Sequence, residues 1–203
     1  MVIIGLTGGI GSGKSYVAKL LSLRGIPVYD SDSNAKRIMS TDADTILKLT
    51  GIVGTTLYSD GILNRSVMAQ YIFGNKTQAK EIESVVHPKV REDFRKWVER
   101  MRKETEICVL ESAILFESGF DSEVDLAVGV YAPDSLRIER CMMRDGMERE
   151  CVMSRIRSQA DQNEICSRCG FVIINDGTIG LKNQIDELIE RCKDIENQIN
   201  KKC

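Results

Sequence analysis

The chain has 203 residues and a formal net charge of −2, with 28 Lys and Arg against 30 Asp and Glu. Hydrophobic residues make up 42% and charged residues 29%, which is ordinary for a globular protein of one or two domains and excludes a mostly disordered chain. The near-neutral balance disfavours a globally basic nucleic-acid-binding protein. No apolar run approaches the ~20 residues of a membrane span, and the first residues do not read as a signal peptide. We therefore expect a cytoplasmic protein with neither nucleic acid nor a membrane as its partner.

The seven cysteines are odd in number and irregularly spaced, which favours free thiols in a reducing cytosol over a disulfide framework. Cys166 and Cys169 have a C-x-x-C spacing, but no second pair follows at a zinc-ribbon distance, and the single histidine, His87, is far away in sequence. A redox or metal role for this pair is kept only as an alternative.

The first elements predict a crossover unit. Residues 2–7 form an apolar, β-branched run bounded by glycines, which predicts a buried strand. Apolar residues at helical spacing then predict a helix that ends at Gly25, and residues 26–29 predict a second strand. A strand, a glycine loop, a helix and a strand in this order imply a parallel sheet that is covered by helices.

Helical periodicity dominates residues 31–104, so we predict a mostly helical insertion there. Its clearest helix follows His87 and begins with Pro88, whose missing N–H costs nothing in a first helical turn. Asp60 and Gly61 mark a turn between two helices.

The sheet pattern returns at residues 107–110, 126–131 and 171–174, each an apolar run. Residues 133–168 are predicted to be helical, and residues 179–199 form a final amphipathic helix. The chain therefore has the pattern of an α/β protein with a parallel sheet core flanked by helices.

The strongest motif runs from Gly8 to Ser15 and fits G-x-x-x-x-G-K-[ST] at every fixed position, between a predicted strand and a predicted helix. Glycines let successive N–H groups point at an anion, and the helix N-terminus adds a partial positive charge. Lys14 can reach the β- and γ-phosphates, and the Ser15 hydroxyl can bind Mg²⁺. The alternative is a glycine-rich turn without a ligand. The motif predicts a bound nucleoside triphosphate, held by Gly9, Gly11, Ser12, Gly13, Lys14 and Ser15.

Asp30 and Asp32 follow the second predicted strand and should emerge at the carboxyl edge of the sheet, where α/β proteins bind ligands. One carboxylate can orient the Mg²⁺ shell while the other accepts a proton from an attacking hydroxyl. The alternative is that either residue simply caps a helix that begins near Asn34.

Seven arginines and no lysine lie between residues 131 and 170. Acidic residues match them in number, so most of these arginines are interpreted as part of a solvated, ion-paired helix surface. The planar guanidinium binds phosphate oxygens with two parallel hydrogen bonds, which lysine cannot do. Arg140 and Arg144 are four residues apart on one helix face, and we predict that both point at one phosphate group.

Three further candidates carry less specific signals. Glu111 ends a predicted core strand, where an acid in a P-loop protein often orients Mg²⁺ or its water. Glu117 lies six residues further on, with a helix-surface glutamate as the alternative. His87 is kept as a substrate contact, although a lone histidine is more often a cap or a packed polar residue.

Together these motifs resemble one family, the dephospho-coenzyme A kinases. The matching segments occur in order over nearly the whole chain, and their combination is far more specific than the P-loop alone. They are residues 5–15, Asp30-Ser-Asp32, Asp60-Gly61, Asn64-Arg65, His87-Pro88, Leu115-Phe116-Glu117, Arg140, Arg144-Asp145 and Asn175-Asp176-Gly177.

The resemblance implies a P-loop kinase that moves the γ-phosphate of ATP to the ribose 3′-hydroxyl of dephospho-coenzyme A, the last step of coenzyme A synthesis. It implies a nucleotide-binding core at 1–39, 105–136 and 169–203, an acceptor-binding helical insertion at 40–104, and a helical lid at 137–168. We expect the protein to be a monomer or a weak homo-oligomer.

The resemblance also assigns roles to residues. Asp32 is the expected base, Lys14 and Arg140 act on the transferring phosphate, and Asn175 with Gly177 lies by the adenine. Tyr16 and Arg144 join the nucleotide contacts. The acceptor contacts are Asp32, Arg65, His87 and Glu117, and the Mg²⁺ contacts are Ser15, Asp30 and Glu111.

The chain departs from the usual family pattern at Ser31, Ala113, Glu111 and Tyr16, where Ala, Pro, Asp and Thr are common. Glu111 bears on the chemistry, because a longer acid on that strand could alter the metal shell. Two other functions stay open at this point. One is a kinase for another small acceptor, such as a nucleoside monophosphate, and the other is a nucleotide-dependent switch that hydrolyses slowly.

Overall fold

The computed structural model describes residues 1–201 and divides into two compact units. The first unit contains Met1–Tyr29 and the chain from Arg100 onward, and the second contains Asp30–Glu99. The finer division, with an insertion at 40–104 and a lid at 137–168, remains a prediction. No helix within residues 1–201 is long and apolar enough to span a membrane.

A five-stranded sheet forms the centre of the first unit, in the order β2-β5-β1-β6-β7. The central strand β1 is parallel to β5 and β6, and β6 is parallel to β7, which confirms the predicted parallel core. Leu6 lies opposite Glu111, the last residue of β5, and Thr7 lies opposite Gly129 of β6, so the carboxyl ends of these strands meet at the edge where the glycine loop begins. The strands are β1 (Val2–Thr7), β2 (Val28–Asp30), β5 (Ile107–Glu111), β6 (Leu126–Tyr131) and β7 (Phe171–Ile174).

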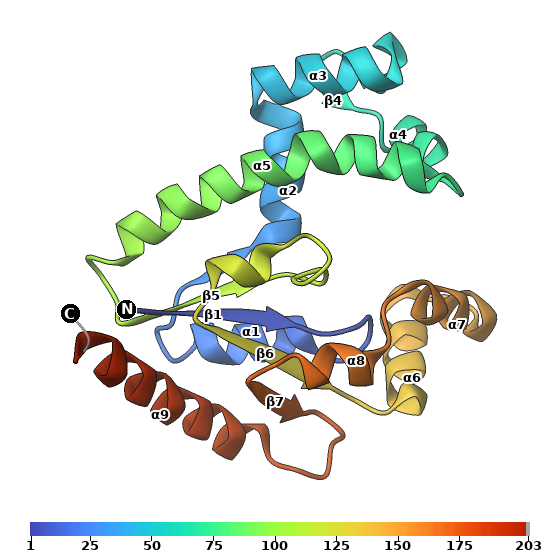
Figure 1. The fold of residues 1–203 in the computed structure, drawn as a ribbon. Helices are drawn as coiled ribbons and strands as arrows, with labels where there is room; N and C mark the ends of the chain where they lie inside the picture. Colours follow the sequence, from blue (N-terminus) through green and yellow to red (C-terminus); the bar gives the residue numbers. More distant parts are fainter. Residues whose placement is uncertain (202–203) are drawn as a thin grey trace. The chain divides into compact units, whose positions relative to one another are not determined.

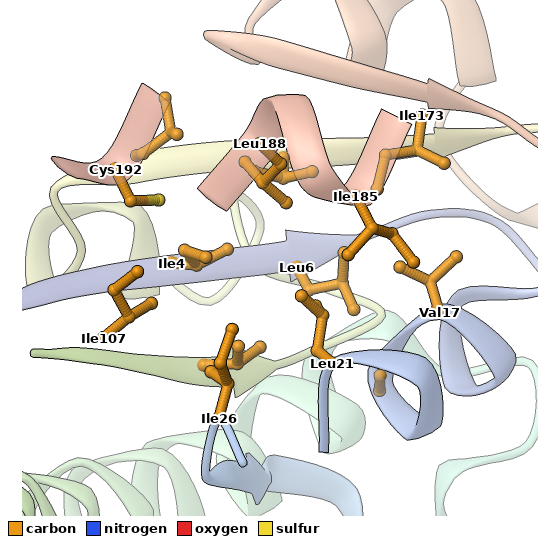
Figure 2. Close-up of a cluster of buried hydrophobic side chains, with 14 of the residues drawn as sticks. Ile4, Leu6, Val17, Leu21, Ile26, Ile107, Ile173, Ile185, Leu188 and Cys192 are labelled. Carbon is orange, nitrogen blue, oxygen red and sulfur yellow. The ribbon is translucent and has the colours of Figure 1, made fainter. Parts of the chain in front are cut away.

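One face of this sheet is covered by α1 (Lys14–Ser22) and α9 (Leu181–Asn200). Ile4 and Leu6 project from the same side of β1 because side chains alternate along a strand. They pack against Leu21 of α1 and Leu188 of α9, and all four side chains are fully buried (Figure 2). This cluster anchors the start of the glycine loop to the largest hydrophobic core of the protein.

The other face of the sheet is covered by the segment after β5, which includes the 3₁₀ turn η2 (Phe120–Glu123). A Cβ atom at Gly5 would touch Leu115 and Val124, so this segment packs directly on the backbone of β1. The carboxylate of Asp125 accepts the N–H of Ile3 at 2.7 Å and ties the segment to the amino end of the strand.

Three helices occupy the stretch between β6 and β7, as predicted. They are α6 (Asp134–Asp145), α7 (Arg149–Ser158) and α8 (Gln162–Ser167). Figure 1 shows them beside the loop that follows β1, and the hydrogen bonds that Ile10 accepts from Arg137 and donates to Gln159 confirm that contact.

The second unit is helical, with one short hairpin. Its long helix α5 carries buried residues at every fourth position, Ile82, Val86, Val90, Phe94 and Val98. The other elements are α2 (Ser31–Thr41), α3 (Ala43–Val53), the 3₁₀ turn η1 (Thr55–Leu57), β3 (Tyr58–Ser59), β4 (Ile62–Leu63), α4 (Arg65–Ile72) and α5 (Lys76–Met101).

Three local predictions for this unit are wrong. Pro88 and His87 lie in the middle of α5 rather than at its start, because the buried stripe runs unbroken through them. Asp60 and Gly61 form the turn of the β3–β4 hairpin, not a link between helices. The helix after the second strand begins at Ser31, three residues before Asn34.

Candidate active site

The loop between β1 and α1 is shaped by two glycines with left-handed backbones. Gly11 has φ of 77° and Gly13 has φ of 92°. A Cβ atom would collide with the main chain of Arg137 at the first position and with the side-chain amide of Asn175 at the second. No side chain caps α1, so the N–H groups at its start are available to an anion, as the motif predicts, except that of Tyr16, which donates to the carbonyl oxygen of Gly13 at 3.0 Å.

Ser12 sits inside this loop with a fully buried side chain. Its carbonyl oxygen accepts hydrogen bonds from Asn175 Nδ2 at 2.8 Å and from Arg140 Nη1 at 3.4 Å. Its hydroxyl has no hydrogen-bond partner within residues 1–201. Because buried polar groups are nearly always paired, an unpaired hydroxyl in a phosphate-binding motif fits a ligand with acceptor oxygens.

Lys14, Ser15 and Glu111 form one polar cluster at the end of β1 and β5. The Ser15 hydroxyl donates to Glu111 Oε1 at 2.7 Å, and Lys14 Nζ donates to the same oxygen at 3.1 Å. The carboxylate is largely buried, so the pair with Lys14 is shielded from water. The structure thus brings together the residue expected on the phosphates and two residues expected on Mg²⁺.

The donor chemistry of this cluster fits Mg²⁺, which prefers oxygen ligands and keeps several waters. Within residues 1–201, no three side chains of Asp, Glu, His or Cys gather into a metal site. A nucleotide-bound Mg²⁺ needs only one or two protein oxygens beside the phosphates, and Ser15 with Glu111 supplies a hydroxyl and a carboxylate.

The two candidate arginines of α6 have different surroundings. Arg140 reaches back to the loop and donates to the carbonyl oxygens of Ser12 and, at 2.9 Å, Asn175. Neither acceptor carries a formal charge, so the guanidinium brings a positive charge to the loop. Arg144 instead forms two hydrogen bonds with Asp145 and is mostly exposed, and its pairing raises the pKa of the guanidinium. The structure brings Arg140 to the loop but does not bring Arg144 there.

Arg137 is a residue whose place the sequence reasoning missed. The sequence predicts only a structural role for it, among arginines that mostly belong to a solvated surface, but it is 3% exposed and donates to the carbonyl oxygen of Ile10. A signal was present, because Arg137 precedes Ile138 and Cys141 on the buried stripe of α6. Gln159, which accepts the N–H of Ile10, was missed too, and no sequence pattern singled it out.

The segment after β7 also contacts the loop. Asn175 is buried and binds the loop through Ser12. The N–H and hydroxyl of Thr178 and the N–H of Ile179 hold the pKa of Asp176 below its usual range and fix the turn around Gly177. Tyr16, one turn into α1, is 56% exposed.

Asp30 and Asp32 belong to the second unit. The carboxylate of Asp30 accepts the N–H groups of Asp32 and Ser33 and caps α2, so the capping interpretation is confirmed for Asp30. Asp32 is exposed in the first turn of that helix.

The other residues that were predicted to contact the acceptor substrate lie far apart in the sequence. Arg65 is exposed at the first turn of α4, and Glu117 is exposed in the loop after β5. His87 is partly buried in α5, and this burial, with the charge of Arg91, lowers its pKa against the opposing effect of Glu83.

The cysteines within residues 1–201 are all free thiols, as expected, and Cys203 lies outside the described residues. Cys166 and Cys169 both pack against Gly129 of β6. Burial raises the pKa of both thiols, that of Cys169 to about 12, so neither has the lowered pKa of a reactive redox cysteine.

Comparison with known proteins gives one consistent result. A family model described as dephospho-CoA kinase matches residues 2–180. The dephospho-CoA kinase of Bacteroides fragilis is 48% identical over 186 residues, which cover 92% of this chain and 90% of that one. The corresponding protein of Porphyromonas gingivalis is 44% identical over 191 residues, 94% of each chain.

The solved structures agree. A crystal structure from Thermus thermophilus is 33% identical, has a TM-score of 0.79, and matches over 94% of this chain and 95% of its own. Shikimate kinase from Acinetobacter baumannii, at 16% identity and a TM-score of 0.52 over 94% of this chain and 92% of its own, shares the fold alone. With the family model covering most of the chain and relatives above 40% identity, the protein belongs to the dephospho-CoA kinase family of P-loop kinases.

Proposed function

We propose that this chain transfers the γ-phosphate of ATP to the 3′-hydroxyl of the ribose of dephospho-coenzyme A, giving coenzyme A and ADP. The observation that carries the proposal is the loop itself, where Lys14 and Ser15 of the strand–loop–helix unit lie with Glu111 and where Arg140 of α6 reaches Ser12. Family membership selects the acceptor, because the phosphate-binding parts alone would serve many kinases.

The reaction is an in-line displacement. The ribose oxygen forms a bond to the γ-phosphorus, the bond from that phosphorus to the β–γ bridging oxygen breaks, and ADP leaves. Because the transition state is loose, its charge lies on phosphoryl oxygens, and positioning with positive charge supplies most of the catalysis. Lys14, Arg140 and the first-turn N–H groups of α1 are the groups that stabilise this charge.

Asp32 accepts the proton of the 3′-hydroxyl as the new bond forms. Its exposure in the first turn of α2 supports this role, because the carboxylate is open to an incoming acceptor. Asp30 is held by backbone N–H groups and orients the turn on which Asp32 lies. Ser15 and Glu111 are the proposed Mg²⁺ contacts, whereas the carboxylate of Asp30, the third predicted contact, is engaged in capping α2. The ion would neutralise part of the charge on the β- and γ-phosphates.

The second unit is the proposed acceptor-binding part. A groove of about 520 Å³ on α5 is lined by His87, Pro88 and the charged residues Arg91, Glu92, Arg95 and Lys96. Three cationic side chains against one carboxylate favour an anionic ligand, and dephospho-coenzyme A carries a diphosphate. Within the same proposal the protein works in the cytoplasm, as a monomer or weak homo-oligomer.

The test is ADP release from Mg·ATP with dephospho-coenzyme A, AMP, adenosine or no acceptor. Strong stimulation by dephospho-coenzyme A alone is the expected result. Stimulation by AMP or adenosine instead would replace the acceptor, and no stimulation by any of them would favour a nucleotide-dependent switch. Detection of 3′-phosphorylated product by mass spectrometry distinguishes transfer from uncoupled hydrolysis.

A further inference from the structure

The peptide groups of Ile10, in the glycine loop, are held by two side chains from distant parts of the first unit. Arg137 Nε on α6 donates to the carbonyl oxygen of Ile10 at 2.9 Å. The N–H of Ile10 donates to Oε1 of Gln159, the residue that follows α7, at 2.8 Å. Both distances are those of well-formed hydrogen bonds, so the donor and the acceptor of this residue are satisfied from outside the loop.

Arg137 is packed tightly against the loop. A Cβ atom at Gly9 would collide with its guanidinium, and one at Gly11 would collide with its main chain. The arginine therefore fills the space behind the loop, and only glycines let the two segments come this close.

The burial of Arg137 is not explained by fold stability alone. Its side chain is 4% exposed, while its ion-pair partner, Asp134, is 66% exposed. The cation thus loses its hydration but is compensated mainly by a solvated carboxylate at 2.8 Å. A well-packed apolar side chain is often at least as stabilising as a buried ion pair, so a charge kept in such a place indicates a role beyond packing.

We propose that Arg137 and Gln159 are positioning residues that hold the peptide of Ile10 and thereby keep the glycine loop in its phosphate-binding shape. With the N–H of Ile10 turned toward Gln159, the loop presents its remaining N–H groups and the end of α1 to the nucleotide. Arg137 also places a buried positive charge behind the phosphates. Neither residue touches the nucleotide in this proposal, which rests on the proposed kinase function.

Steady-state kinetics of Arg137→Met and Gln159→Leu test the inference. Each should raise KM for ATP about tenfold, since each removes one of two bonds that preorganise the loop. KM for dephospho-coenzyme A should not change. Arg137→Gln keeps a hydrogen-bond donor but removes the charge, so an intermediate KM separates the two contributions. The double variant should be less than additive, because both residues act through one peptide.

Asp125→Leu is the matched control. It removes another side-chain acceptor from a backbone N–H, that of Ile3, at the opposite end of β1. It should lower the melting temperature without changing KM for ATP. If Arg137→Met and Gln159→Leu shift KM for ATP no more than this control does, their role is structural and the inference is wrong.

A calorimetric measurement of Mg·ADP binding keeps the inference separate from the proposed function. If the wild-type protein shows no acceptor-dependent turnover, the proposed function fails, but the dissociation constant for Mg·ADP still reports on the loop. It should rise about tenfold in both variants and stay unchanged in Asp125→Leu. Equal dissociation constants in all four proteins would overturn the inference.

Discussion

The two units use their polar side chains in opposite ways. In the first unit, the buried side chains of Arg137 and Asn175 and the partly buried side chain of Gln159 bind backbone groups of the glycine loop. In the second, charged side chains pair with one another at the surface, as Arg37 does with Asp93 at 2.6 Å. Buried bonds to the backbone fix one shape, whereas an exposed ion pair contributes less than about 1 kcal/mol. The shape of the nucleotide site is therefore fixed by stronger interactions than those between the charged side chains on the surface of the second unit.

Apolar side chains, by contrast, are divided between core and surface in both units. Ile4, Leu6 and Leu188 in the first unit are fully buried (Figure 2), as Leu49 is in the second. Leu47 in the second unit is 73% exposed. Burial of apolar surface is the main stabilising contribution to folding, so truncation should be costly at the buried positions and not at the exposed ones.

The largest effect should come from the second unit, through chemistry rather than stability. Asp32→Asn removes the proposed base and should lower kcat by about 10³-fold, since general-base groups contribute about 10²–10⁴-fold. KM for ATP should stay within about twofold, because the nucleotide loop is in the other unit. Asp44→Asn, also an exposed acid of the second unit, is the control and should turn over normally. An unchanged kcat in Asp32→Asn would refute the base assignment.

The stability contrast can be measured with two leucines. Leu188→Ala empties a fully buried position between α9 and the sheet and should cost about 3 kcal/mol of unfolding free energy. Leu47→Ala on α3 changes an exposed side chain and should stay within about 0.5 kcal/mol. Urea denaturation gives both values, and equal losses would contradict the difference in burial between the two leucines.

Arg140 and Arg144 allow a comparison within α6 between an arginine that binds the loop and one that does not. Arg140→Lys keeps the charge but loses the planar donor set that reaches Ser12 and Asn175, so kcat should fall about tenfold. Arg144→Lys changes an exposed side chain paired with Asp145 and should have almost no effect on turnover. If both substitutions lowered kcat equally, the result would support the sequence prediction that both arginines bind phosphate. It would contradict the view that Arg144 only pairs with Asp145.

The smallest effect concerns His87, the one histidine of the chain. Its pKa is lowered by burial, so the unfolded chain binds the proton more tightly than the folded one. Stability is then fully present above the unfolded pKa of about 6.5 and is lost as the pH falls through the lowered folded value. Because the side chain is partly exposed, the loss should be below about 1 kcal/mol.

Melting temperatures between pH 7.5 and 5 test this for wild type and His87→Gln. The variant should show a shallower decline on acidification. Parallel curves for the two proteins would mean that His87 does not contribute to the pH dependence.

Much of the first unit could be predicted because its signals are local. The strands at 126–131 and 171–174 are continuous apolar runs, and both ends are confirmed. The elements of the second unit were harder to predict from the sequence. Its hairpin has only two residues in each strand, too few for a periodic pattern. Pro88 is typical of a first helical turn, but the stripe of buried residues through Val86 and Val90 continues across it, so Pro88 does not mark the start of α5.

The residues of the site likewise include some that local patterns predicted and others that they did not. The motif predicted the roles of Lys14 and Ser15, and the end of a core strand predicted that of Glu111, because both signals are local; the structure brings the three residues together. The two hydrogen bonds that Ile10 makes with Arg137 and Gln159 could not be predicted, since these residues lie 127 and 149 positions further along the chain. Contacts at such separations depend on tertiary packing, which no local pattern encodes.

These long separations have a consequence for synthesis of the protein. The glycine loop leaves the ribosome first, yet Ser12 finds Asn175 only 163 residues later. Because residues emerge at about 5–20 per second, the loop waits roughly 8 to 33 seconds for the side chains that shape it. The nascent chain should therefore gain nucleotide affinity late and in one step. Nucleotide binding by chains arrested at increasing lengths would then report the completion of the fold, well after its first helix has formed.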